Sequence, residues 1–206
     1  MMSNAHRFIF VHVPKTGGNS IQSVLLPLSD DRMVLTQHQD GVERFDVVGP
    51  VTVNKHTPLA HYGATLGDLS PYFVFVSARH PFDRAVSFYL SPHRWANQGP
   101  SGAWEIAQPS WSESNFLEFL DTMTPFISFV DVAGSIQQVD DIIRFETVRA
   151  DFARVARRIG APDLELTVHR NKSAADSEQR TAVMADKALR RIVEDRFAVD
   201  MAYLKY

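Results

Sequence analysis

Two short polar segments carry the most distinctive chemistry of this chain. Residues 14–20 read Pro-Lys-Thr-Gly-Gly-Asn-Ser and follow the apolar run at 8–13. Backbone amides that open a helix after such a run bind anions, and Lys15 adds a positive charge, so the segment predicts a phosphate site. Lys15 precedes both glycines, whereas the loop that binds nucleoside triphosphates carries its lysine after them. This order predicts a different phosphate-bearing ligand.

The second segment begins with Arg79, directly after the apolar run at 72–78, and Ser87 follows eight residues later. Pro81 suits the first turn of a helix, so Arg79 is expected at a strand end and Ser87 on the helix. One guanidinium and one hydroxyl in this arrangement predict a second oxyanion site. Because ligands of parallel sheets bind at the carboxyl ends of the strands, both anion sites are expected at one edge.

The elements that must position these segments are strands followed by helices. Continuous β-favouring runs predict buried strands at 8–13 and 72–78 and a short one at 142–145. Helical spacing predicts one helix that begins at residue 19, a second that begins at residue 81, a third that ends at Ile159 and a fourth over about 177–203. Residues 29–55 support no firm assignment, and 91–114 are expected to form a long surface excursion. This alternation predicts an α/β fold of three layers, α/β/α, around a central parallel sheet.

Composition limits the class of protein. The 206 residues are 45% hydrophobic, which predicts a single domain over 1–206. The formal net charge of −3 argues against a nucleic-acid partner. The chain has no cysteine, which excludes disulfides, thiolate metal sites and a cysteine nucleophile. No leader or membrane anchor is evident near the first residues, so we expect a soluble, cytoplasmic protein.

The two segments resemble, in order and separation, the signature motifs of sulfotransferases that use 3′-phosphoadenosine 5′-phosphosulfate (PAPS). Lys55-His56, the run Ile143-Arg144-Phe145-Glu146 and residues 169–173 are similar to landmarks of the carbohydrate-sulfotransferase branch. The resemblance implies a P-loop-like sulfotransferase fold in a soluble, bacterial-type member. It also implies PAPS as co-substrate, with the 5′-phosphosulfate on the first motif and the 3′-phosphate on the second. The donor-binding residues it implies are Lys15, Thr16, Gly17, Gly18, Asn19, Ser20, Arg79, Ser87, Lys172 and Ser173.

Sulfuryl transfer needs a base for the acceptor hydroxyl and a positive charge on the leaving phosphate. Lys15 suits the second role because its ammonium can sit on the oxygen between phosphorus and sulfur. His56 is the predicted base, since histidine titrates near neutral pH and the resemblance puts this segment opposite the donor. Other groups stay open for this role: His61, His80, His12, His93, Asp83 and Glu146. No metal is predicted, because Pro58 separates His56 from His61 and their spacing is not that of a zinc pair.

The predicted activity is O-sulfation of a carbohydrate or small-metabolite hydroxyl, and the acceptor itself stays open. Trp95, Trp104 and Trp111 either form an aromatic platform for the acceptor or anchor the 91–114 excursion on the core. Arg84 and Asp83 are read as an ion pair. Two other functions stay open: a small-molecule or nucleoside kinase with an atypical phosphate loop, and a non-catalytic module that binds phosphate or sulfate groups. The oligomeric state is also open.

Overall fold

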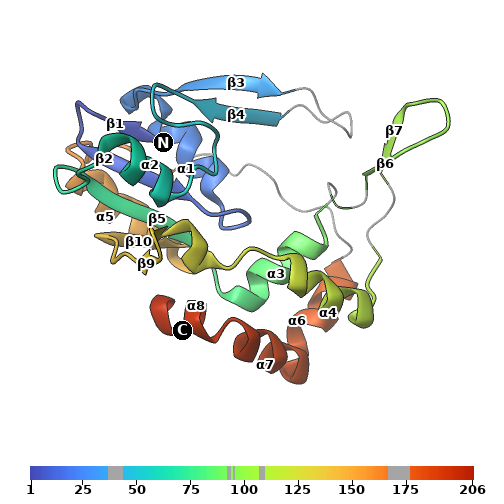
Figure 1. Ribbon diagram of the computed structural model, residues 1–206. Coiled ribbons are helices and arrows are strands. Elements are labelled where there is room, and N and C mark those ends of the chain that lie inside the picture. Colours follow the sequence, from blue (N-terminus) through green and yellow to red (C-terminus); the bar gives the residue numbers. More distant parts are fainter. Residues whose placement is uncertain (37–43, 92–93, 95, 107–109, 167–176) are drawn as a thin grey trace. The chain divides into compact units, whose positions relative to one another are not determined.

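The computed structural model describes residues 1–36, 44–91, 94, 96–106, 110–166 and 177–206 (Figure 1). The chain falls into two compact units. The first consists of Met1–Val34, Phe45–Arg79 and Pro125–Arg170, and the second of Leu35–Arg44, His80–Thr124 and Asn171–Tyr206. The expectation of a single domain stays a prediction.

A four-stranded sheet forms the centre of the first unit. Its order is β1 (Met2–Ser3), β2 (Phe8–His12), β5 (Phe73–Ala78) and β10 (Asp141–Arg144). β2, β5 and β10 are parallel, whereas β1 is antiparallel to β2. His12 pairs with Ser77 and Arg144 with Ala78, so three carboxyl ends meet at one edge. The α/β class with a mostly parallel central sheet is confirmed, and the three-layer arrangement stays a prediction.

The helices of the first unit are α1 (Gly18–Leu25), η1 (Leu26–Leu28), α2 (Leu59–Leu66), η3 (Phe126–Phe129), η4 (Phe145–Thr147) and α5 (Val148–Arg158). Of these, α1 follows the predicted strand at 8–13, and η4 and α5 follow the one at 142–145. Two small two-stranded sheets pair β3 (Arg32–Thr36) with β4 (Arg44–Val48), and β8 (Asp131–Val132) with β9 (Ser135–Ile136). The apolar sides of the sheet, α1 and α5 share one core, which includes Phe8, Phe10, Ile21, Leu25, Phe75, Ile143, Phe152 and Val155.

The second unit is mainly helical. It contains α3 (Pro81–Tyr89), α4 (Glu113–Thr122), α6 (Ser177–Ala185), α7 (Lys187–Arg196), α8 (Ala198–Leu204) and the hairpin β6 (Ala96–Gln98) with β7 (Trp104–Ile106). Its core joins α3, α4 and α7 through residues that include Phe82, Tyr89, Phe116, Leu120, Leu189 and Val193.

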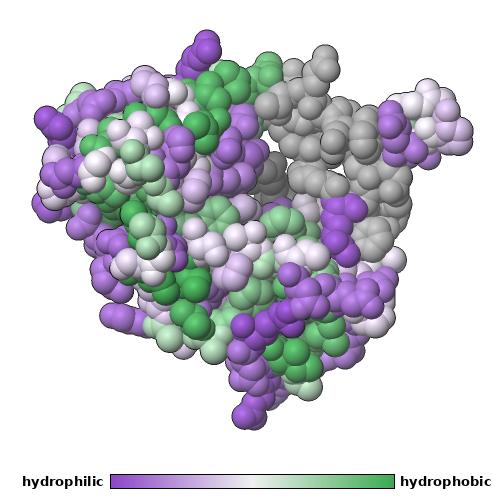
Figure 2. All heavy atoms as spheres, viewed as in Figure 1, coloured by the Kyte–Doolittle hydropathy of each residue, from purple (hydrophilic) through white to green (hydrophobic). Residues whose placement is uncertain are grey.

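One long final helix was predicted, and this prediction is wrong. Asp186 separates α6 from α7, because its carboxylate accepts hydrogen bonds from the amides of Ala188 and Leu189, both at 2.9 Å. An aspartate in this position starts a new helix rather than continuing the old one. Within α7, Leu189 is buried, whereas Ile192 is 46% exposed. Figure 2 accordingly shows hydrophilic and hydrophobic residues side by side on the surface of α7.

The 91–114 excursion forms the β6–β7 hairpin and leads into α4. Trp111 packs against the rings of Tyr89 and Phe116, with centroid distances of 5.3 and 4.8 Å, which makes it an anchor on the core of the second unit. Trp95 and the side chain of Trp104 lie outside the described residues. In the described parts of the chain, no helix is long and apolar enough to cross a bilayer.

Candidate functional site

The Lys15 loop leaves the sheet at the carboxyl end of β2 and turns into α1. Lys15 has a backbone φ of 69° and Gly17 a φ of 84°, so two residues near the turn adopt the left-handed conformation. Glycine does so without a penalty, but a residue with a Cβ atom is held there at a cost of about 1–2 kcal/mol. Strain of this kind concentrates at functional sites, and here it fixes the direction in which the Lys15 side chain leaves the backbone.

Gly17 and Gly18 allow the loop to pack tightly between two rings of the protein. A Cβ atom on Gly18 would lie 2.0 Å from Cδ2 of His12, and one on Gly17 would lie 2.9 Å from Cδ2 of Phe145. In the structure, both glycines lie close to protein side chains, Gly18 to His12 and Gly17 to Phe145. Their lack of side chains brings the start of α1 against the ends of β2 and β10.

Thr16 ties the loop to the neighbouring strand. Its side chain is fully buried, and its hydroxyl donates to the Val13 carbonyl at 2.7 Å and lies 2.6 Å from the hydroxyl of Ser77. Because the Thr16 hydrogen is directed to Val13, Ser77 must donate to Thr16. The hydroxyl of Thr16 thus holds β2 and β5 together, which leaves its backbone amide as the group with which Thr16 can bind an anion.

Asn19 and Ser20 stand in the first turn of α1. The Ser20 amide donates to the Gly17 carbonyl at 3.2 Å, and the Ser20 side chain is 9% exposed. The buried Oδ1 of Asn19 has no hydrogen-bond partner among the described residues. A buried polar atom in this condition is costly unless a ligand or water completes it. The loop therefore fits a polar ligand at the start of α1.

A buried hydrogen-bond network lies beside the loop and centres on Gln22. Its Oε1 is 2.9 Å from Nδ1 of His12, and its Nε2 donates to the Lys55 carbonyl at 2.9 Å. Because a carbonyl only accepts, the amide orientation is determined, and the proton of His12 must be on Nδ1. Burial lowers the pKa of His12 well below its ordinary value of 6.5, and the charge of His56 lowers it further, against the Gln22 hydrogen bond, which raises it. His12 is thus a neutral, structural histidine.

His56 lies at the same edge of the sheet. Its Nδ1 is 2.9 Å from the carbonyl oxygen of His12, the last residue of β2, and the two rings pack with centroids 4.3 Å apart. The segment that carries His56 is tied to β4 because the Lys55 amide donates to Oδ1 of Asp46 at 2.6 Å. In the neutral form, the bond to the His12 carbonyl puts the His56 proton on Nδ1, so Nε2 carries the lone pair.

The other candidate bases have different surroundings. Nε2 of His61 lies 3.0 Å from the Val51 carbonyl. His80 lies in the second unit, where Nε2 is 3.3 Å from Glu194 and Nδ1 is 3.6 Å from Asp83. These contacts give His61 and His80 structural partners, and His93 lies outside the described residues.

Arg79 extends from the end of β5, and its guanidinium stacks on a ring that the sequence analysis had not singled out as part of the site. Cζ of Arg79 lies 4.1 Å from the ring centre of Phe145, at the start of η4. The ring is 41% exposed, which is high for phenylalanine. Ser87 belongs to the second unit, on α3, and is 8% exposed. Its convergence with Arg79 on one anion stays a prediction, and Lys172 and Ser173 lie outside the described residues.

Arg84 is a structural residue, as expected. It is 1% exposed in the second unit, and its NH2 group donates to the Thr124 carbonyl at 2.9 Å. Burial lowers the pKa of Arg84 to about 10, although the nearby carboxylate of Asp200 raises it. The carboxylate that acts on Arg84 is thus that of Asp200, whereas the expected partner, Asp83, lies 3.5 Å from Arg190.

Asp151 on α5 holds the turn that presents Phe145. Its Oδ2 accepts hydrogen bonds from the Arg144 amide at 2.9 Å and the Thr147 hydroxyl at 2.7 Å, and Arg154 donates to Oδ1. Burial raises the pKa of Asp151, but these hydrogen bonds outweigh that effect and hold it below its usual range. The sequence contains no spacing signal for this role, because the partners come together only when β10 and α5 pack.

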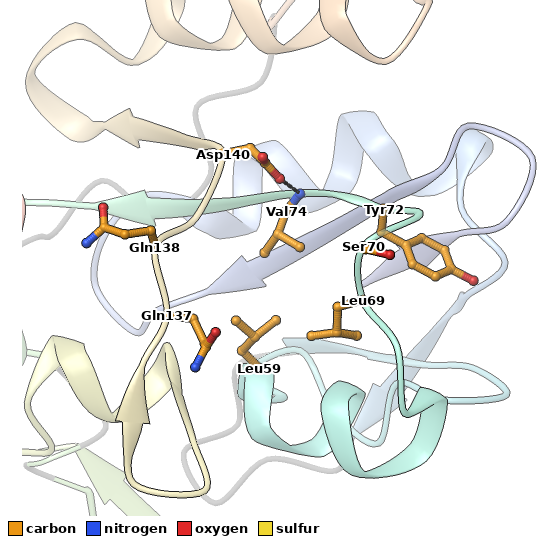
Figure 3. A pocket seen from close by; sticks show the side chains of 8 residues that line it. All are labelled: Leu59, Leu69, Ser70, Tyr72, Val74, Gln137, Gln138 and Asp140. Atoms are coloured by element: carbon orange, nitrogen blue, oxygen red, sulfur yellow. Dashed lines mark hydrogen bonds between the residues drawn. The ribbon is translucent and has the colours of Figure 1, made fainter.

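A pocket of about 270 Å³ lies at the opposite edge of the same sheet (Figure 3). Its walls come from the start of α2 and from the segments that lead into β5 and β10, where Asp140 accepts a hydrogen bond from the Val74 amide at 2.7 Å. None of the predicted site residues lines it. Within the described residues, no group of three or more histidine, aspartate or glutamate side chains is placed to hold a metal ion.

Comparison with known proteins agrees with this arrangement. The family model described as "Sulfotransferase family" matches residues 1–206. An uncharacterized protein of Archaeoglobus fulgidus is 28% identical over 111 residues, which is 53% of this chain and 84% of that protein. No solved structure gives a significant match. Because the family model spans the whole chain, the chain belongs to the sulfotransferase family.

Proposed function

We propose that this protein transfers a sulfuryl group from PAPS to a hydroxyl of a carbohydrate or small metabolite. The observation that carries the proposal is the hydrogen bond from His56 to the carbonyl of His12. His12 ends β2, and three residues later Lys15 begins the turn into α1. A candidate base is thus hydrogen-bonded to the strand end from which a candidate cation follows, where the family's donor is expected.

The donor's two phosphate groups would be held by different parts of the edge. The amides of residues 16–19 and the Lys15 ammonium would bind the 5′-phosphosulfate, and Arg79 would bind the 3′-phosphate. Ser87, Lys172 and Ser173 complete this proposal as further donor ligands. When bound, the donor supplies the sulfuryl group that is transferred.

His56 would accept the proton of the acceptor hydroxyl at Nε2. Its bond to the His12 carbonyl keeps the other ring proton on Nδ1, so the ring needs no rearrangement before it acts. As the proton arrives, the positive charge that forms on His56 lies beside the neutral ring of His12. Lys15 would neutralise the charge that grows on the departing phosphate, so the chain's own residues serve both ends of an in-line transfer.

Donor binding is the first test. Isothermal titration calorimetry with adenosine 3′,5′-bisphosphate should show one site, and Arg79→Ala should weaken it about 10- to 100-fold, the range of a lost charge-assisted hydrogen bond pair. Arg158→Ala is the matched control, because Arg158 also stacks on a phenylalanine, Phe73, but at the amino end of β5. It should bind normally. The proposal fails if the unmodified protein does not bind the bisphosphate.

The base is tested by transfer of radiolabelled sulfate from PAPS to a panel of sugars, phenols and small alcohols. His56→Gln should lose about 10²- to 10⁴-fold in turnover, the usual contribution of a general base, while it still binds the bisphosphate. His61→Gln serves as the control and should retain activity. Near-normal turnover in His56→Gln would assign the base elsewhere. Magnesium-dependent turnover of ATP in place of PAPS would identify a kinase.

A further inference from the structure

Phe145 contacts both segments to which the two phosphate groups are assigned. Its ring lies 4.1 Å from the guanidinium carbon of Arg79, and it is the nearest neighbour of the position that a Cβ atom on Gly17 would take, at 2.9 Å. Gly17 belongs to the Lys15 loop, and Arg79 begins the second motif. One ring therefore stands between the two segments in the first unit.

Stacking determines how Arg79 presents its hydrogen-bond donors. The N–H groups of a guanidinium lie in its plane, so a ring on one face restrains the plane without using the donors. A planar group held in this way offers its edge to an oxyanion in a fixed direction. The exposed 41% of Phe145 shows that burial in the core does not account for the position of this ring.

The backbone on both sides of Phe145 is held by the same carboxylate. Asp151 accepts hydrogen bonds from the amide of Arg144, immediately before Phe145, and from the hydroxyl of Thr147, two residues after it. Arg154 braces Asp151 and also donates to Asp141 at the start of β10. These hydrogen bonds hold the turn that carries the ring, and a residue that positions a ligand-binding group needs such support.

We propose that Phe145 is a positioning residue that sets the direction of the Arg79 guanidinium, and so favours nucleotides that carry a 3′-phosphate in addition to the 5′-phosphate. The inference rests on the proposed function. It adds a residue whose effect depends on the ligand: removal of the ring should weaken binding only where a 3′-phosphate is present.

The test compares two nucleotides by calorimetry: adenosine 3′,5′-bisphosphate and adenosine 5′-monophosphate. Phe145→Leu should lower affinity for the bisphosphate about 3- to 10-fold, the range of a lost cation–π contact, and leave affinity for the monophosphate unchanged. Phe145→Tyr preserves the stacking face and should restore bisphosphate binding. In an Arg79→Ala background, Phe145→Leu should have no further effect, because the group on which it acts is absent.

A second variant reaches the same feature without altering the ring. Thr147→Val removes one hydrogen bond to Asp151 and should weaken bisphosphate binding less than Phe145→Leu does, again without an effect on the monophosphate. Equal losses for the two nucleotides, or no loss in Phe145→Leu, would overturn the inference while the proposed function stands. If the unmodified protein binds neither nucleotide, the proposed function itself fails. Far-ultraviolet circular dichroism and the melting temperature of each variant verify that it is folded.

Discussion

Gln22 is fully buried, and the hydrogen bonds of its side-chain amide determine which ring nitrogen of His12 carries the proton. It accepts from Nδ1 of His12 and donates to the carbonyl of Lys55, the residue before His56. Buried amides with both ends satisfied rigidify their surroundings. At the residue scale, Gln22 on α1 therefore holds both the histidine beside the candidate base and the backbone just before it.

Protonation of His12 gives a prediction at this scale. Because burial lowers the pKa of His12, its ring should remain neutral and protonated on Nδ1 as the pH falls through 6.5, its ordinary pKa. Long-range ¹H–¹⁵N correlation spectra of the imidazole nitrogens measure this directly. In Gln22→Glu, the added carboxylate should raise the pKa of His12 toward neutrality. A His12 ring that titrates near pH 6.5 in the unmodified protein would contradict the network.

The lowered pKa of His12 also makes the stability of the protein depend on pH. The unfolded chain takes up a proton at His12 at higher pH than the folded chain does, so the free energy of unfolding falls as the pH drops below 6.5. His12→Gln should reduce this part of the acid sensitivity, as measured by urea unfolding between about pH 5 and pH 7.5. His56→Gln is the comparison variant, because His56 is only half-buried and its replacement should change the acid sensitivity of unfolding less.

At the element scale, the start of α1 depends on how closely the helix approaches β2. Gly18→Ala should destabilise the protein by about 3 kcal/mol, because its Cβ atom would overlap the ring of His12 and force it to move. Urea unfolding measures the loss. Calorimetry should also show weaker binding of adenosine 3′,5′-bisphosphate, since the loop shifts with the helix.

Gly63→Ala is the matched control, because Gly63 is a helical glycine in α2. The nearest atom to its added Cβ would be a methyl group of Val132 at 3.2 Å, which can move by the few tenths of an ångström required. The higher helix propensity of alanine, about 1 kcal/mol, offsets that crowding. Its stability should therefore remain close to that of the unmodified protein. Equal losses at Gly18 and Gly63 would show that the approach to His12 is not tight.

Elements also mark where prediction from sequence worked best. Buried strands such as 8–12 and 73–78 were recognisable because uninterrupted apolar runs are characteristic of parallel sheets. The helix α5 (Val148–Arg158), predicted up to Ile159, was recognisable from its periodicity and from Gly160, which has a φ of 76°. The division of residues 177–204 was missed, because the apolar spacing continues across Asp186 although the backbone hydrogen bonds do not.

At the scale of the whole molecule, stability depends on two buried opposite charges, Arg84 and Asp200, as well as on the two apolar cores. Arg84 and Asp200 are each 1% exposed in the second unit. Arg84→Met should cost about 3–5 kcal/mol in the free energy of unfolding, because it leaves the Asp200 carboxylate buried without its cation. Arg84→Met combined with Asp200→Leu should recover part of the loss, since no charge then stays buried.

Arg196→Met supplies the comparison on the surface of the same unit. Arg196 pairs with Asp121, and their side chains are 43% and 64% exposed. Exposed pairs of this kind contribute about 0–1 kcal/mol, so the variant should unfold at nearly the same urea concentration as the unmodified protein. If Arg196→Met lowered the free energy of unfolding strongly, or Arg84→Met hardly changed it, burial would not determine how much each charge contributes to stability.

The sequence by itself determined the two strands that carry the motifs and the helix starts that follow them, because a buried parallel strand and a helix start after glycine are local patterns. The chemistry of the motifs stays a prediction. Only the tertiary structure decided that Gly17 lies against Phe145 and Gly18 against His12. The same holds for the hydrogen bond between the hydroxyls of Thr16 and Ser77, and for the one by which Gln22 orients the ring of His12. These contacts join residues far apart along the chain. They form when the strands adopt their register and the helices pack, and residue spacing does not encode that information.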